Sequence, residues 1–225
     1  MAIFTGKNLN ILNKAQKLIF DNFSFEINKG EIWIAMGPNG IGKSSFWEAL
    51  IGIGPIKSGK IFLNNVDITN KLPAERVRLG MRYIAQNNAL FDDISVEENL
   101  KIVAESLLRS KERKAAIENA VKTFWLEPLL KKKPGKLSGG QRRRVELSKI
   151  MIGPSTLILM DEPFAAVDEE FTQKINQIFI QMKKNGTSFL INDHNSFAMR
   201  SIADYCIHLG LSDQKNPTSI EKIKH

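Results

Sequence analysis

The sequence predicts an α/β fold in which helices flank a parallel sheet, together with an additional β layer and an inserted helical section. Three observations lead to this prediction. A glycine-rich loop joins a buried strand at residues 32–36 to a helix at 45–50. Strand-like runs separated by turns fill residues 1–35, whereas apolar residues at helical spacing dominate residues 95–124. Beyond residue 155, a buried strand, an amphipathic helix and another buried strand follow one another.

The composition indicates a water-soluble globular protein of one domain. The 225 residues suffice for a well-buried core, and 43% hydrophobic with 25% charged residues is ordinary for such proteins. No apolar run approaches the ~20 residues of a membrane span, and residues 1–6 lack the features of a signal peptide. Cys206 is the single cysteine and is expected to be an inert core thiol. The net charge of +8 permits a nucleic acid or an anionic membrane as neighbour without choosing between them.

The N-terminal third is expected to form a strand-rich layer. Its strands are predicted at residues 3–4, 18–20, 23–27 and 61–63. Turn signals stand at Asn28-Lys29-Gly30 and at Asn64-Asn65. Pro73 then opens a short helix that Gly80 ends, and a strand at residues 82–85 leads to Gln86.

A phosphate-binding loop follows the strand at residues 32–36. The segment Gly37-Pro38-Asn39-Gly40-Ile41-Gly42-Lys43-Ser44 fits G-x-x-x-x-G-K-[ST], and Ser45 continues it into a helix. Backbone N–H groups of such a loop converge on an anion at the helix N-terminus. We expect Lys43 to reach the β- and γ-phosphates and the Ser44 hydroxyl to hold Mg²⁺. A chance glycine-rich turn is the alternative, but the flanking strand and helix favour nucleoside triphosphate binding.

Two capping boxes mark helices in the middle of the chain. Ser95 and Glu98 start a helix with Val96 and Leu100 on its apolar face, and a second helix follows at residues 117–124. Leu137-Ser138-Gly139-Gly140-Gln141 contains the second box and starts a helix expected to run to Met151. A helix N-terminus with two glycines and a serine hydroxyl is a second predicted anion site.

Polar residues at strand ends supply the expected chemistry. Asp161 ends a buried strand and is a candidate Mg²⁺ partner through water, and Glu162 is the candidate general base for an attacking water. His194 and Gln86 follow two other strands and could contact the γ-phosphate, the metal or the water. Each of these residues could instead have only a structural role. That alternative is less favoured because all of them follow a phosphate loop in the order such a site requires.

Taken together, these motifs resemble those of ATP-binding-cassette (ABC) ATPases. The resemblance covers residues 3–209 and includes Ala165-Ala166-Val167-Asp168, and Leu137–Gln141 is close to diagnostic. It is most similar to the branch that holds the lipopolysaccharide-export and branched-chain amino-acid transporter ATPases. The resemblance implies a P-loop NTPase with a RecA-like parallel-sheet core, an antiparallel β layer and an inserted helical subdomain. Within one ABC ATPase domain spanning 1–225, the core is expected at 1–86 and 146–225, and the helical subdomain at 87–145.

The resemblance also implies partners, cofactors and a cellular place. ATP and Mg²⁺ are the expected cofactors. A second ATPase subunit is expected to contribute Ser138, Gly139 and Gly140 to each ATP, and Gln141 and Asp168 belong to the same nucleotide-binding set. The expected location is the cytoplasmic face of an inner membrane, as a peripheral subunit, without direct contact to nucleic acid.

A membrane subunit is expected to dock near Leu90, Phe91 and Ile94. These apolar residues lie in a turn-rich segment and could instead pack inward.

The chain departs from the family pattern at two places. The family places an aromatic residue near position 12 to stack on adenine, but Leu12 and Asn13 stand there. The C-terminal residues 211–225 are polar, and the usual glycine-containing hairpin is not recognisable.

Two other functions compete with a transporter subunit. A soluble ABC ATPase acting as an assembly factor or on nucleic acid remains open, although the chain lacks room for a long coiled coil and carries one cassette. A kinase using the same loop is less compatible with the Leu137–Gln141 segment and the Asp161-Glu162 pair.

Overall fold

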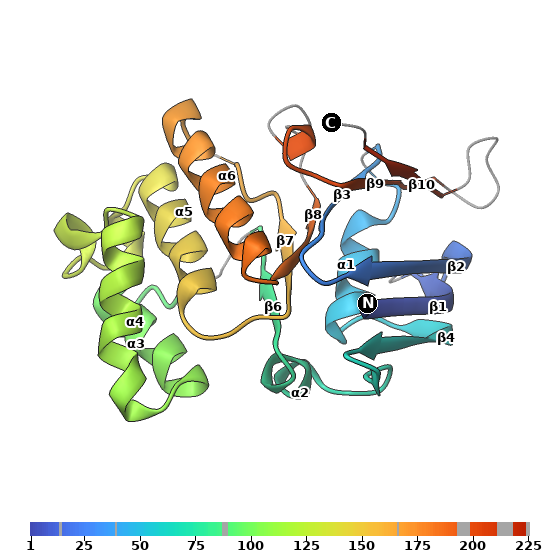
Figure 1. Ribbon diagram of the computed structural model, residues 1–225, viewed down its shortest axis with the longest axis horizontal. Coiled ribbons are helices and arrows are strands. Elements are labelled where there is room, and N and C mark those ends of the chain that lie inside the picture. The colour runs from blue at the N-terminus through green and yellow to red at the C-terminus, as the bar shows by residue number, and fades with distance from the viewer. Residues whose placement is uncertain are drawn as a thin grey trace.

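The computed structural model describes residues 1–13, 15–38, 40–86, 90–165, 167–192, 199–210 and 218–223. The chain forms two sheets with helices around them, and the two sheets lie on either side of helix α1 (Figure 1). Helices α3, α4 and α5 gather at the end of the molecule opposite the antiparallel sheet (Figure 1). The α/β class, the β layer and the helical section predicted from the sequence are therefore confirmed.

The antiparallel sheet has four strands whose N-terminal members are longer than the sequence predicted. Its order is β2 (Leu18–Asn28), β1 (Ala2–Leu12), β4 (Ile56–Leu63) and β5 (Val66–Asp67). The runs predicted separately at 18–20 and 23–27 belong to one strand. The register between β1 and β2 shifts near Asn8 and Asn22, which both have positive φ. Because a β-bulge accommodates an irregular residue without ending the pairing, each strand continues past its asparagine.

The second sheet is parallel except at one edge. Its order is β10 (Ser219–Lys222), β9 (Tyr205–His208), β3 (Ile32–Met36), β8 (Ser188–Asn192), β7 (Leu157–Asp161) and β6 (Met81–Ile84). The inner parallel strands β3, β7 and β8 have nearly continuous apolar cores, as expected for strands covered on both faces, whereas the edge strand β6 has Arg82 and Tyr83 half-buried between Met81 and Ile84. Their carboxyl ends point to one edge, where the polar residues of the site follow.

Helix α1 (Lys43–Ile51) fills the space between the two sheets. Phe46 and Trp47 are completely buried, and they share one apolar cluster with β1, β2 and the facing side of the parallel sheet. Arg76 in α2 (Pro73–Arg78) is also buried, and its Nη1 donates to the carbonyls of Ala49 and Leu50, at 3.3 Å and 2.5 Å. A cation at these last carbonyls stabilises the C-terminus of α1.

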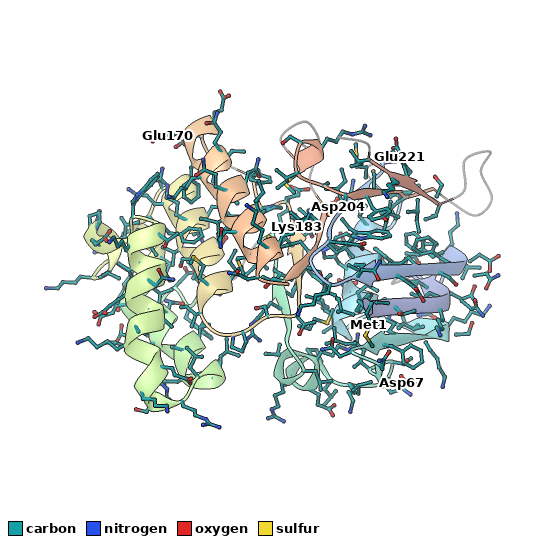
Figure 2. All side chains as sticks on the ribbon, viewed as in Figure 1. Met1, Asp67, Glu170, Lys183, Asp204 and Glu221 are labelled. Atoms are coloured by element: carbon teal, nitrogen blue, oxygen red, sulfur yellow. The ribbon has the colours of Figure 1, made fainter. Side chains whose placement is uncertain are left out.

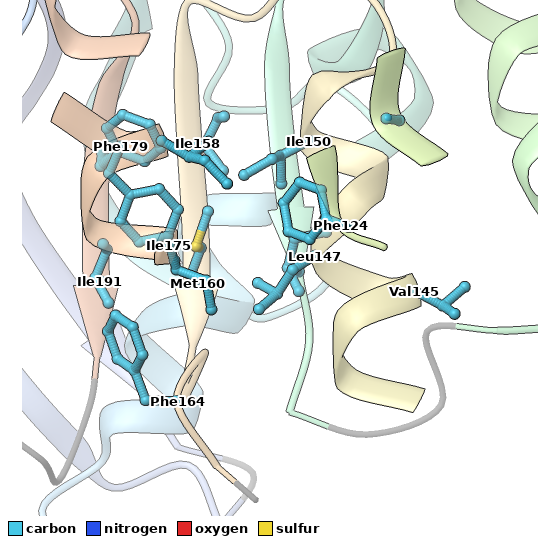
Figure 3. Close-up of a cluster of buried hydrophobic side chains, with 14 of the residues drawn as sticks. Phe124, Val145, Leu147, Ile150, Ile158, Met160, Phe164, Ile175, Phe179 and Ile191 are labelled. Carbon is cyan, nitrogen blue, oxygen red and sulfur yellow. The ribbon is translucent and has the colours of Figure 1, made fainter. Parts of the chain in front are cut away.

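The opposite face of the parallel sheet is covered by α6 (Glu169–Lys184) and α5 (Gly139–Ser148) (Figure 1). Phe179 and Ile175 of α6 pack on Ile158 and Met160 of β7, beside Leu147 of α5 (Figure 3). The helix predicted to run to Met151 ends at Ser148 and continues as a 3₁₀ turn at Lys149–Met151. This turn still buries Ile150, so the apolar pattern persists although the helix type changes.

The helical section contains α3 (Val96–Leu107) and α4 (Ser110–Thr123). Ser95 caps α3 as predicted, because its Oγ accepts from the Glu98 N–H at 3.2 Å while Glu98 accepts from the Ser95 N–H at 2.7 Å. Short 3₁₀ turns at Glu127–Leu129 and Pro134–Lys136 then lead toward α5. Among the described residues, no helix is both long and apolar enough to cross a membrane.

The C-terminal strand β10 was not predicted. It pairs antiparallel with β9, opposite Tyr205 to His208, and all four of its residues are exposed. An edge strand of this kind is held by backbone hydrogen bonds, so it has no apolar pattern to reveal it. Nearby, Lys183 at the end of α6 contacts both carboxylate oxygens of Asp204, at 2.6 Å and 2.7 Å (Figure 2).

Candidate functional site

A cavity of about 580 Å³, lined mostly by polar residues, opens at the carboxyl edge of the parallel sheet. It brings together residues from the phosphate loop, from the ends of β6, β7 and β8, and from the turn after β1. The lining residues are Asn13, Ala15, Gly40, Gly42, Lys43, Ser44, Ser45, Glu48, Gln86, Asp161, Glu162 and Asn192. Ligand sites of open α/β sheets form at this edge, and the volume is within the usual range for small-molecule sites.

The phosphate loop turns into α1 through a glycine that no other residue could replace easily. Gly42 caps α1 with φ +105°, and a Cβ there would lie 2.7 Å from Ile19 Cδ1. Lys43 Nζ folds back onto the loop and donates to the carbonyl of Gly37 at 2.7 Å. Burial lowers the pKa of Lys43, and the carboxylates of Glu162 and Asp161 partly offset this effect. The ammonium group is therefore held beside the acidic residues.

The acidic pair at the end of β7 is fixed by its neighbours in the sheet. Asn192 Nδ2 donates to Asp161 Oδ1 at 2.6 Å, and the Glu162 N–H donates to the Asn192 carbonyl at 2.7 Å. Glu162 has φ +50°, a left-handed conformation that turns the chain sharply after the strand. Gln86 Nε2 donates to Glu162 Oε2 at 2.6 Å, so the ends of β6 and β7 meet through side chains.

A buried arginine on α5 holds these strand ends from behind. Arg143 donates to the carbonyls of Ala85, Asp161, Glu162 and Pro163 at distances between 2.9 Å and 3.1 Å. It also contacts Glu146 Oε2 at 2.8 Å, one turn along α5, and both side chains are 4% exposed. The helix that begins with the Ser138–Gln141 motif is therefore bonded directly to the backbone on both sides of the predicted catalytic residues.

Besides the two turn residues Asn13 and Ala15, sequence reasoning missed Asn192, Arg143 and Glu48. Asn192 directly follows a strand predicted at residues 188–191, and Arg143 lies two residues after Leu137–Gln141 within a charged run. Glu48 lies four residues after Ser44, on the same face of α1, and this spacing could have indicated it. Glu48 and Asp161 line the same cavity, and burial together with the carboxylates of Asp161 and Glu48 raises the pKa of Tyr83 to about 12.

The predicted adenine position is occupied differently from expectation. Leu12 is half-buried where β1 ends opposite Leu18 of β2, and it does not line the cavity. Asn13 and Ala15 line it instead, because the chain turns there, with Asn13 Oδ1 accepting from the Lys17 N–H at 2.9 Å. Contact of Leu12 with the nucleotide stays a prediction, and Asn13 and Ala15 are two further candidates for this position.

Other predicted residues lie apart from the cavity or outside the described residues. Gly37, Pro38 and Ile41 belong to the loop but do not line the cavity, and Ile41 is buried. Asn39 and His194 are outside the described residues.

The segment Leu137–Gln141 lies apart from the cavity. Ser138 caps α5, its Oγ accepting from the Gln141 N–H at 3.3 Å, and Ser138 and Gly139 are exposed. None of the residues 138–141 lines the cavity. Asp168 is also exposed and outside it, where it caps α6 by accepting from the Phe171 N–H at 2.7 Å and pairs with Arg144 at 3.3 Å.

The three apolar residues expected at a docking surface have different environments. Leu90 is only 7% exposed and packs in the cluster with Val96 and Leu100, so its assignment to the surface is wrong. Ile94 is half-buried, and Phe91 is 63% exposed. The Asn99 side chain fixes this turn, accepting from the Phe91 N–H at 2.8 Å and donating to the Phe91 carbonyl at 3.0 Å.

Comparisons with known proteins agree with these features. Residues 20–165 match the sequence profile of the family described as ABC transporter. The lipopolysaccharide export system ATP-binding protein LptB of Escherichia coli (strain K12) is 33% identical, over 100% of this chain and 95% of the relative. A probable branched-chain amino acid transport ATP-binding protein, LivF of Archaeoglobus fulgidus, is 33% identical over 78% of this chain and 74% of the relative.

The structural comparison gives the same picture. The crystal structure of a nucleotide-free ATP-binding cassette from an ABC transporter superposes with a TM-score of 0.83, at 26% identity, over 100% of this chain and 92% of that one.

Proposed function

This chain belongs to the ABC transporter family as an ATP-hydrolysing subunit, and from that premise we propose that it powers lipopolysaccharide export. The end-to-end similarity to an ATP-binding protein of that export system supports the choice of substrate. A single observation carries the hydrolytic role: one cavity collects the phosphate-loop lysine, a hydroxyl, an amide and two adjacent carboxylates.

Each residue of the cavity has a part in the proposed reaction. Backbone N–H groups of the loop and Lys43 bind the phosphates of ATP. Ser44, Gln86 and Asp161 offer hydroxyl, amide and carboxylate oxygens, which are the hard donors that suit Mg²⁺. When bound, Mg²⁺ neutralises charge on the phosphates. Glu162 accepts a proton from the attacking water, with His194 as its proposed helper.

We assign the second half of the ATP site to another copy of the chain. The N–H groups at the start of α5 and the Ser138 hydroxyl form a second anion-binding element, and this element is exposed and does not line the cavity of its own chain. A two-fold pair would place this element of one subunit, with Asp168, over the ATP of the other.

Residues 87–145 form the proposed helical subdomain. In this proposal it transmits conformational changes at the ATP site to a membrane subunit on the cytoplasmic face. Phe91 supports this assignment, because a phenylalanine 63% exposed beside the buried Leu90 offers an apolar anchor for a short helix. Arg143 joins this subdomain to both strand ends of the ATP site, so a shift of Glu162 or Gln86 is transmitted to α5.

The hydrolytic role is tested with Glu162→Gln, which retains the hydrogen-bonding shape of the side chain but removes the base. ATP binding should persist while turnover falls by at least ~10²-fold, since a general base contributes about 10²–10⁴. Glu127→Gln, at an exposed acid in a 3₁₀ turn, is the matched control. Near-normal turnover of the Glu162 variant would move the base elsewhere.

The transported substrate needs a separate experiment in the organism that encodes the chain. Depletion should leave newly made lipopolysaccharide in the inner membrane, and the wild-type gene should restore its export whereas Glu162→Gln should not. Normal lipopolysaccharide export after depletion would refute the substrate while leaving the ATPase assignment intact.

A further inference from the structure

Three metal-ligating side chains meet on β9 and β10, apart from the ATP cavity. Cys206 and His208 are two residues apart on β9 and therefore point to the same face of the sheet. Glu221 on β10 is the register partner of Cys206. Cys206 Sγ lies 4.0 Å from His208 Nδ1, and His208 Nε2 lies 2.7 Å from Glu221 Oε2. One ligand atom from each of the three residues lies within 4.8 Å of the other two.

The donor set selects a particular class of cation. Thiolate and imidazole ligands suit borderline transition metals, whereas Mg²⁺ and Ca²⁺ prefer oxygen ligands alone. Tetrahedral Zn²⁺ with bonds of ~2.0–2.3 Å places neighbouring ligand atoms ~3.3–3.8 Å apart. The sulfur-to-nitrogen distance of 4.0 Å is close to this spacing. The cluster thus needs a small contraction rather than a rearrangement of strands.

We propose that Cys206 Sγ, His208 Nδ1 and the Glu221 carboxylate form a binding site for one Zn²⁺-like transition-metal ion per chain. Two ligands are already close together, and Glu221 is exposed on an edge strand, so its carboxylate can turn from Nε2 toward the sulfur that it faces in register. Water fills the remaining position of the tetrahedron. Binding converts Cys–SH to a metal thiolate and releases its proton to solvent.

The surroundings of the cluster set its affinity. Burial raises the pKa of the Cys206 thiol to about 11. Arg200 is a cation near both Cys206 and Glu221, and its Nη2 lies 3.9 Å from Met36 Sδ. It weakens a bound dication by repulsion, and Arg200→Gln should therefore bind the ion more tightly.

The position gives such an ion a structural effect. The ion would join β10 to β9, and Figure 2 shows Glu221 on this side of the molecule, away from α3 and α4. His208 is the register partner of Met36, the residue before Gly37 of the phosphate loop. Bound metal would therefore fix the edge strand β10 to β9, the strand that neighbours the start of that loop.

The experiment uses the full chain, without an affinity tag, chelator-treated and free of nucleotide. Titration with Co²⁺ should produce a thiolate-to-cobalt charge-transfer band in the near ultraviolet, saturating at one ion per chain. Cys206 is the single cysteine, so no other residue can give this band. Zn²⁺ should abolish the band by competition and raise the melting temperature, whereas Mg²⁺ and Ca²⁺ should do neither.

Variants distinguish the proposed site from binding elsewhere. His208→Gln and Glu221→Gln should each weaken binding by more than the ~10–100-fold typical of a lost second-shell partner. Glu170→Gln, at an exposed acid on α6, is the control and should leave affinity unchanged. Because Cys206 is buried, both Cys206→Ser and Cys206→Ala are melted without metal before use. An absent charge-transfer band, Zn²⁺ binding that survives loss of Cys206, or unchanged affinity in His208→Gln would overturn the proposal.

Discussion

Replacing Arg143 by methionine should lower stability sharply, because the methionine has similar length but donates nothing. The guanidinium makes five hydrogen bonds, four to backbone carbonyls and one to the buried Glu146. Removing one partner of a buried ion pair costs about 3–5 kcal/mol. Arg142 Nε remains 3.5 Å from Glu146, so we expect the lower end, ~3 kcal/mol. For a chain of this size that is a fall of roughly 6–12 °C in melting temperature.

The double variant Arg143→Met with Glu146→Met separates the two contributions of the arginine. Replacing both members of a buried pair by apolar residues is often close to neutral, so the part of the melting-temperature loss that comes from the unpaired Glu146 should return. The part that comes from the four backbone carbonyls should not return, because they still lack a donor. ATPase activity should be low in both the single and the double variant, because in both the carbonyls of Asp161 and Glu162 lack their donor. Calorimetry and steady-state ATPase assays measure both effects. A single variant within ~2 °C of wild type, or a double variant that regains full activity, would refute the reasoning.

Three further outcomes are expected. Mixing Lys43→Ala with Ser138→Arg chains should restore part of the ATPase activity, since one site of the mixed dimer is intact; no recovery despite proven mixed dimers would contradict a shared site. Phe91→Ala should change the free energy of unfolding by less than ~1 kcal/mol but should abolish co-purification with membrane subunits. Leu90→Ala, a control at a buried residue, should lower the free energy of unfolding by ~2–5 kcal/mol. Without an aromatic at the cavity turn, ATP and GTP affinities should differ by less than ~100-fold, and Ala15→Tyr should tighten ATP through stacking of about 1–3 kcal/mol; a larger preference in the wild type would reveal another base-reading residue.

Local rules predicted much of this molecule. The capping boxes at Ser95 and Ser138, the phosphate loop and the buried strands depend on residues within a few positions of one another, so their patterns are visible in the sequence. The grouping of Lys43 with Asp161 in one cavity is not local, but it was predictable because parallel strands end at a common edge.

Non-local pairing explains what the sequence did not predict. β10 exists because β9 offers it hydrogen-bond partners, and its exposed residues carry no apolar signal. Leu90 and Phe91 are adjacent and both apolar, and only the packing against Val96 and Leu100 decides that one is buried. Arg143 is one of three consecutive arginines, and its role depends on carbonyls from strands far away in sequence.

The enclosure of α1 between two sheets has a consequence for hydrogen exchange. Amides of α1 can exchange only when both sheets separate, which is close to global unfolding, whereas α4 buries only Ala120 and Val121 and can open by itself. The chain should thus contain a slowly exchanging half that carries the phosphate loop and a faster half that includes α4. Protection that nucleotide adds to the faster half would then measure how strongly the two halves are coupled.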